Sequence, residues 1–107
     1  MRNTAARFSI DDGDLVIEDA LSGKFLYRGR PTGALVRASV RVPGSDDAVL
    51  LTGEPQSLVL VRISSIGSVV WSHRLDRYPT VPSLRAVPGF VFVAGHRIDA
   101  GDGQPAP

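Results

Sequence analysis

Apolar and polar residues alternate along much of this chain with a period of two, the spacing of a β-strand with one buried face. The clearest stretch is residues 34–42, where one face would carry Ala34, Val36, Ala38, Val40 and Val42 and the other Arg37, Ser39 and Arg41, with Leu35 as the exception. Six further short apolar runs have strand composition: Leu15–Ile17, Lys24–Arg28, Ala48–Thr52, Leu58–Ile63, Ser68–Arg74 and Phe90–Ala94.

Turn-forming residues separate these runs. They are Asp11-Asp12-Gly13, Ser22-Gly23, Pro43-Gly44, Ile66-Gly67 and Pro88-Gly89. The 11 Gly and 8 Pro leave no window for a mid-sized helix. The pattern predicts an all-β fold, an antiparallel meander of eight or nine strands, with a single small β-barrel or sandwich as the alternative. We expect one domain over residues 1–98 and a disordered tail over residues 99–107.

An internal repeat organises the predicted strands. Placing Gly23 over Gly67, a shift of 44 residues, also superimposes Tyr27 on the Trp71 position. At the same shift Ser39-Val40-Arg41 lies over Ser83-Leu84-Arg85, and one residue more brings Pro43-Gly44 over Pro88-Gly89. The repeat units are a partial one at about 7–30, a full one at 34–75 and a partial one at 83–98. A period in the low forties that holds four strands is typical of a propeller blade.

Two segments carry a family resemblance. Residues 57–72, SLVLVRISSIGSVVWS, place an apolar strand before a Gly turn and a strand with Trp after it, and residues 88–95, PGFVFVAG, resemble the next inner strand. This resembles the blades of PQQ-like β-propellers, and implies propeller-blade-like repeats. No cofactor- or metal-binding position of that family is matched, so we expect no cofactor and no metal. About two blades are present, whereas a closed propeller needs about four or more.

Three arrangements would satisfy so short a repeat array. Several chains could form one ring, the strands could curl into one small barrel or sandwich, or an open meander could dock on a partner. Because repeat units cannot bury their apolar faces alone, we expect a protein partner or a homo-oligomer.

Composition narrows the classes of function. The 107 residues suit one domain, and a net charge of +1 provides no strong field toward nucleic acid or a membrane. The absence of cysteine excludes disulfides, thiolate nucleophiles and Cys-based zinc sites. No signal-peptide pattern or membrane-spanning run occurs, so the expected location is cytoplasmic.

No pattern indicates catalysis. The segments His73-Arg74-Leu75-Asp76 and His96-Arg97-Ile98-Asp99 repeat the order His-Arg-apolar-Asp. The intervening Arg opposes a bound cation, and residues three apart on a strand point to opposite faces. We interpret both segments as strand ends entering polar loops, and expect no enzyme. An enzyme would require His73 and His96 to converge on one pocket with a carboxylate.

The candidate contact residues combine arginine with aromatic side chains, which are enriched at protein interfaces. They are Arg30, Trp71, Arg74, Arg77, Tyr78 and Arg97. Tyr78 is expected in a mobile, exposed loop, whereas Trp71 fits a core position at least as well as a contact.

The leading hypothesis is a non-enzymatic protein–protein interaction module, which self-assembles or docks on a partner. One alternative is an immunity or antitoxin-type inhibitor of a toxin. Another is a small-ligand site, for example for a sugar stacked on Trp71 or Tyr27. Single-stranded nucleic acid is disfavoured because the 11 Asp and Glu residues offset the basic residues.

Overall fold

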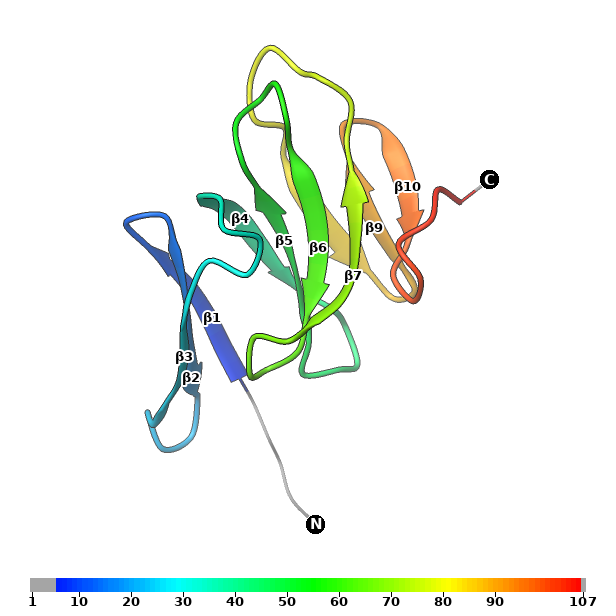
Figure 1. Ribbon diagram of the computed structural model, residues 1–107. Helices are drawn as coiled ribbons and strands as arrows, with labels where there is room; N and C mark the ends of the chain where they lie inside the picture. Colours follow the sequence, from blue (N-terminus) through cyan, green and yellow to red (C-terminus); the bar gives the residue numbers. More distant parts are fainter. Residues whose placement is uncertain (1–5, 107) are drawn as a thin grey trace.

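A computed structural model describes residues 6–106, which form ten strands in three antiparallel sheets (Figure 1). The first sheet contains β1 (Ala6–Asp11), β2 (Asp14–Asp19) and β3 (Phe25–Gly29). The central sheet contains β4 (Val36–Arg41), β5 (Ala48–Thr52), β6 (Val59–Ile63) and β7 (Val69–Arg74). The third sheet contains β8 (Leu84–Val87), β9 (Phe90–Val93) and β10 (His96–Asp99). Strands follow one another in chain order within each sheet, so each sheet is a meander.

The all-β, antiparallel prediction is confirmed, and residues 6–106 contain no helix. The strand number is ten rather than eight or nine. The segment His96–Asp99, interpreted as a strand end, is itself a strand, and Ile98 within it is buried. None of the three sheets closes into a barrel. The predicted domain began at residue 1 and the tail ended at residue 107; residues 1–5 and 107 lie outside the described part.

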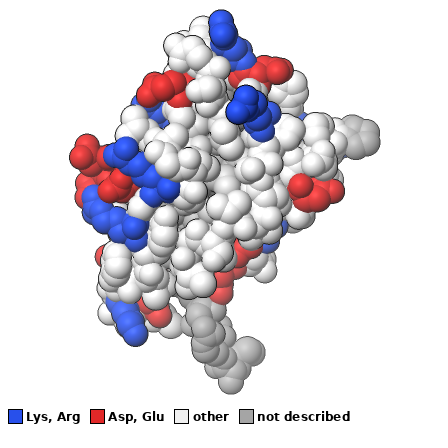
Figure 2. Space-filling model, in the orientation of Figure 1, with Lys and Arg blue, Asp and Glu red and all other residues white. Residues whose placement is uncertain are grey.

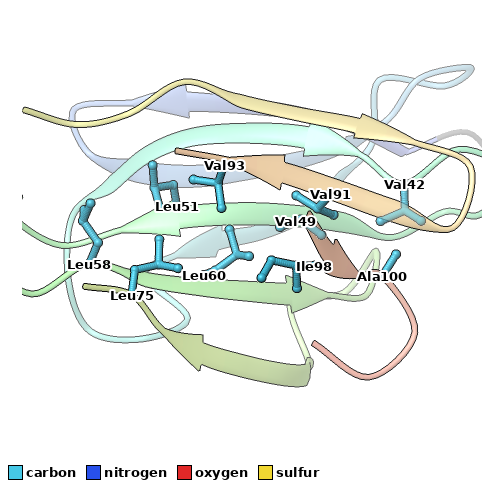
Figure 3. Packing of buried hydrophobic residues seen from close by; sticks show 10 residues of the cluster. All are labelled: Val42, Val49, Leu51, Leu58, Leu60, Leu75, Val91, Val93, Ile98 and Ala100. Carbon is cyan, nitrogen blue, oxygen red and sulfur yellow. The ribbon is translucent and has the colours of Figure 1, made fainter. Parts of the chain in front are cut away.

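The three sheets stack, with the central sheet between the other two (Figure 1). One face of the central sheet carries Leu50 and Val61, which belong to the same buried cluster as Leu15 and Ile17 of the first sheet. The opposite face belongs to a second cluster, shown in Figure 3, whose buried residues are Val42, Val49, Leu51, Leu58, Leu60, Leu75, Val91, Val93, Ile98 and Ala100. All five residues of β5 are buried, since this strand has a sheet on each side. That double burial accounts for the continuous apolar run at 48–52.

The predicted single apolar face of residues 34–42 is wrong. Val36 belongs to the cluster shared with the first sheet, whereas Val42 belongs to the cluster shared with the third sheet. A register irregularity between Val36 and Ala38, where β4 pairs with β5, separates the two. An extra residue in a strand reverses the face of every residue beyond it, so one short strand serves both cores.

The segment after β10 is ordered, in contrast to the predicted disordered tail. The N–H of Gly103 donates to the carbonyl of Asp99, and the N–H of Asp99 donates to the carbonyl of Gln104. Pro105 then forms a bridge with Ile98. The polar, Gly-rich composition that suggested a tail serves here as turn chemistry.

Candidate interaction surface

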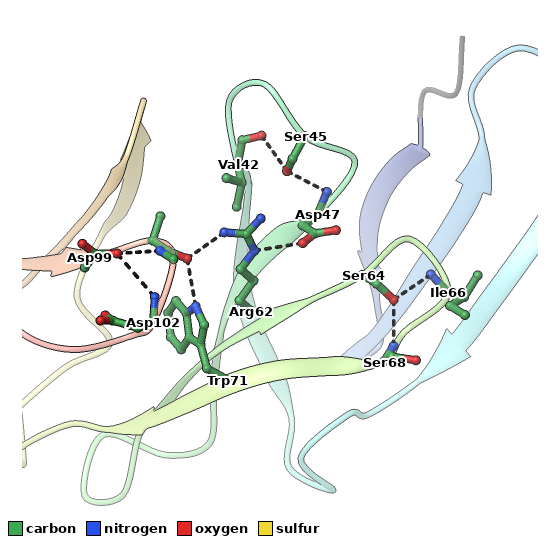
Figure 4. Close-up of polar contacts among 12 residues, drawn as sticks. Val42, Ser45, Asp47, Arg62, Ser64, Ile66, Ser68, Trp71, Asp99 and Asp102 are labelled. Carbon is green, nitrogen blue, oxygen red and sulfur yellow. Dashed lines mark hydrogen bonds and ion pairs between the residues drawn. The ribbon is translucent and has the colours of Figure 1, made fainter. Parts of the chain in front are cut away.

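Trp71 of β7 packs against and hydrogen-bonds to the third sheet, and so connects it to the central sheet. Its ring covers Gly103, where an added Cβ would lie 2.5 Å from Cε3 of the indole. The indole Nε1–H donates to the carbonyl of Ala100 at 2.9 Å, and the Arg62 guanidinium donates to the same oxygen at 2.7 Å. Figure 4 shows both side chains directed at this one acceptor. Trp71 therefore acts as an internal docking residue, which agrees with the core interpretation of its position.

Arg62 is also fixed on its other side. Its Nε lies 2.9 Å from Oδ2 of Asp47, and the two side chains are only 17% and 23% exposed. Charge-assisted hydrogen bonds are stronger than neutral ones, and partial burial reduces their screening by solvent. Arg62 therefore links the start of β5 to the turn of the third sheet.

The first sheet meets the central sheet in the same way. The ring of Tyr27 covers Gly67, where an added Cβ would lie 2.4 Å from Cδ1 of the tyrosine. Tyr27 and Trp71 each stand four residues after a turn glycine, Gly23 or Gly67. Each ring lies on the turn glycine of the next sheet along the chain. The small-ligand hypothesis would thus have to use the opposite ring face of either aromatic.

Three turns share one backbone pattern. In the turn after β2, the Asp19 carboxylate accepts from the N–H groups of Leu21 and Ser22, and Gly23 N–H donates to the Asp19 carbonyl. In the turn after β10, Asp99 accepts in the same manner from Gly101 and Asp102 (Figure 4). Ser64 has this role in the shorter turn after β6. A short polar side chain that caps its own turn fixes the loop without tertiary contacts.

The predicted contact residues do not form one patch. Arg30 follows the first sheet, where its Nε lies 2.7 Å from Oδ1 of Asp14, whereas Arg97 lies on the third sheet, beyond the central one (Figure 1). Arg74 and Arg77 are exposed and form no side-chain hydrogen bond or ion pair with the rest of residues 6–106. The six residues are therefore spread over the segment after β3, the central sheet, the loop after β7 and the third sheet.

Tyr78 is not the exposed loop aromatic that the sequence suggested. It is half-buried against the core cluster of Figure 3, and its backbone N–H donates to the carbonyl of Pro55 at 2.9 Å. Its hydroxyl oxygen is buried without a hydrogen-bond partner among the described residues. Tyr78 thus anchors the long loop between β7 and β8.

Ion pairs cover the outer face of the first sheet. Arg7 pairs with Glu18 at 3.0 Å, and Arg28 lies between Asp11 at 3.1 Å and Asp14 at 3.2 Å. The hydrogen bond from Arg30, opposed by burial and reinforced by Arg28, holds the pKa of Asp14 below its usual value. Asp11 and Asp14 raise the pKa of Arg28. Figure 2 shows basic and acidic side chains interspersed at the side of the molecule where the first sheet lies in Figure 1, beside a broad uncharged surface.

The outer face of the third sheet is different in kind. Val91 and Val93 are buried against the central sheet, so Phe90 and Phe92 point to the opposite face, where they are half-buried. The guanidinium carbon of Arg97 lies 4.8 Å from the centroid of the Phe90 ring, and that of Arg85 lies 5.0 Å from that of Phe92. We call these four residues the Arg–Phe face.

The Arg–Phe face was missed at the sequence level except for Arg97. The signal was the alternation Phe90-Val91-Phe92-Val93, which separates aromatic from branched residues by face. Neither Arg85 nor Arg97 has a carboxylate partner within residues 6–106. Each arginine of the first sheet, in contrast, forms an ion pair with a carboxylate.

No metal-binding cluster is found among the described residues. Residues 6–106 contain no group of three or more His, Asp or Glu side chains that could hold a metal ion. Two surface hollows are lined by Arg41, Gly44, Ser45 and Asp46, and by Ala6, Arg7, Phe8, Ala20, Ser39 and Arg41; neither includes His73 or His96. The described part also has no helix that is long and apolar enough to cross a bilayer.

Comparison with known proteins gives no match: no family model, no curated protein and no solved structure is similar to this chain.

Proposed function

We propose that this chain is a non-enzymatic protein-interaction module whose three-sheet stack binds a further β-sheet on its open end. The observation that carries the proposal is the Arg–Phe face of the third sheet. It presents two half-buried phenylalanine rings beneath two guanidinium groups that lack carboxylate partners. Aromatic residues and arginine are the types most enriched at the centres of protein interfaces.

The contrast between the two ends of the stack supports this assignment. On the first sheet, salt bridges neutralise the arginines and the outer face resembles an ordinary solvated surface. On the third sheet, the guanidinium groups rest on apolar rings, where a second protein can accept their hydrogen bonds. The third sheet is therefore the better candidate for continued stacking.

The internal construction of the chain supports a blade-like sheet as the natural partner. The sheets span residues 6–29, 36–74 and 84–99, close to the repeat units at 7–30, 34–75 and 83–98. Strand β4, the first of the central sheet, contacts β1 and β8, the first strands of its neighbours. First strands side by side fit sheets repeated around a common axis, and the aromatic on each following turn glycine repeats one contact between neighbouring sheets. On this hypothesis the stack is an open arc of PQQ-like propeller blades.

The test is the mass of the full chain in solution, measured by light scattering over a range of concentrations. We expect the mass to rise above that of one chain, and Phe90→Ser with Phe92→Ser to abolish the rise. Val70→Ser is the matched control, because Val70 is an exposed apolar strand residue of the central sheet. A chain that stays monomeric throughout, or a double serine variant that associates like the wild type, contradicts the proposal.

A further inference from the structure

We propose that the Arg–Phe face of one copy docks on the Asp19–Lys24 turn of a second copy, so that chains associate head to tail. This inference rests on the proposed function and names its partner. Two turns of this chain share their backbone hydrogen bonds, and one of them is covered within the chain whereas the other is open.

The pattern Asp-Ala-x-x-Gly occurs twice, at 19–23 and at 99–103. At residues 99–103, Gly103 and Ala100 are buried beneath Trp71 and Arg62. At residues 19–23, Gly23 and Ala20 are exposed, and nothing lies within 4 Å of the position where a Cβ of Gly23 would be.

The backbone of the two turns is prepared for the same contact. Gly23 has φ +73° and Gly103 has φ +76°, and an Asp carboxylate caps both turns. The Ala100 carbonyl accepts two hydrogen bonds from the central sheet, whereas the Ala20 carbonyl accepts none within residues 6–106. Leu21, beside this free acceptor, is 76% exposed. The Asp19–Lys24 turn therefore has the backbone of a turn that is covered elsewhere in this chain, but it is itself left open.

Arg97 is the residue positioned to use that site. It stands two residues before the capping Asp99, as Arg62 stands two residues before the capping Ser64. Arg62 points away from its own sheet and reaches the turn of the next one at 2.7 Å. Arg97 points out of the third sheet, where its guanidinium contacts the ring of Phe90 and no described carboxylate. By this correspondence its acceptor in a second copy is the carbonyl of Ala20.

The contact differs from the internal ones in one respect. The position four residues after Gly103 is Pro107, so no tyrosine or tryptophan is available there to lie on Gly23. Phe90 and Phe92 supply the apolar surface instead, and the exposed Leu21 of the second copy supplies an apolar side chain to meet them. Because the two surfaces are different, the contact is heterologous, and repetition gives a ring or an open chain.

The experiment measures self-association of the full chain by analytical ultracentrifugation. We expect Arg97→Glu and Leu21→Glu each to raise the dissociation constant by about tenfold or more. Arg74→Glu and Ile66→Glu are the matched controls. Arg74 is an exposed arginine without a described partner, and Ile66 is the exposed apolar residue of the equivalent turn on the central sheet.

Mixing the two disruptive variants tests the head-to-tail geometry. Arg97→Glu keeps an intact turn and Leu21→Glu keeps an intact Arg–Phe face, so an equal mixture should form a one-to-one dimer. If wild-type association is lost in Phe90→Ser/Phe92→Ser but persists in Leu21→Glu, the inference is wrong and the proposed function stands. If the mixture stays monomeric, the head-to-tail inference is also wrong. A wild-type chain that never associates contradicts both the head-to-tail inference and the proposed function.

Discussion

Replacement of Gly103 by alanine should weaken the attachment of the third sheet to the central one. The added Cβ would lie 2.5 Å from Cε3 and 2.6 Å from Cδ2 of Trp71, closer than real side chains pack. Gly103 is buried, so the indole ring has to shift. A shift of the ring also displaces its Nε1–H from the carbonyl of Ala100.

The magnitude follows from three contributions. A left-handed backbone costs an L-residue about 1–2 kcal/mol, overpacking costs about 1–3 kcal/mol, and a lost hydrogen bond costs about 1 kcal/mol. Gly23→Ala provides the matched control, because its φ of +73° is nearly the same as the +76° of Gly103 and its Cβ meets nothing within 4 Å. Only the first contribution applies to Gly23. We therefore expect Gly103→Ala to be less stable than Gly23→Ala by about 2–4 kcal/mol.

Urea denaturation measures this difference, followed in parallel by fluorescence and far-UV circular dichroism. Trp71 is the single tryptophan, so its fluorescence reports on the contact itself. The measurement belongs at concentrations where both variants are monomeric, since Gly23 lies in the proposed docking turn. Equal free energies of unfolding for the two variants would refute the docking role of Trp71 on Gly103.

Three further predictions follow from the same contacts. Trp71→Phe removes the indole N–H and part of the ring that covers Gly103, so the free energy of unfolding should fall by at least about 1 kcal/mol in urea titrations. Arg62→Met leaves the Asp47 carboxylate half-buried and unpaired, and should cost about 1–3 kcal/mol by the same assay. Since Arg30 lowers the pKa of Asp14, the stability that this carboxylate adds above its usual pKa should disappear as the pH falls through the folded value. Asp14→Asn should flatten the acid limb of the curve of unfolding free energy against pH.

The Arg62→Met prediction has a matched control within the chain. Arg7→Met removes an exposed ion pair whose side chains are 57% and 36% exposed, and should change stability by less than about 1 kcal/mol. If Arg7→Met and Arg62→Met lower the free energy of unfolding equally, partial burial of the Arg62–Asp47 pair does not increase its contribution to stability. If Asp14→Asn leaves the acid limb unchanged, the Arg30 contact does not hold the pKa of Asp14 down in solution.

The strand class and the turns could be predicted from local pattern alone. Alternation and Gly chemistry act over a few residues, and they located the turns at Gly23, Gly67 and Gly89 as well as the absence of helix in residues 6–106. The same local reasoning placed residues 34–42 on one face, because it could not anticipate the irregularity between Val36 and Ala38.

The contacts between sheets could not be predicted in this way. Trp71 and Arg62 both donate to the carbonyl of Ala100. Every residue has a backbone carbonyl, so the identity of the acceptor residue does not indicate this contact. The segment after β10 was predicted to be disordered from its composition. Its order depends on the Asp99 cap and on Trp71 above Gly103, and Trp71 lies far away in the chain.

On the proposal made above, the stack ends in a face that a second copy covers at the Asp19–Lys24 turn. Amide NMR spectra of the full chain, recorded at low and high concentration, test it residue by residue. We expect concentration-dependent shifts at β8, β9, β10 and residues 20–23, with β6 and β7 unchanged. Spectra that do not change with concentration, or shifts confined to β6 and β7, would contradict it.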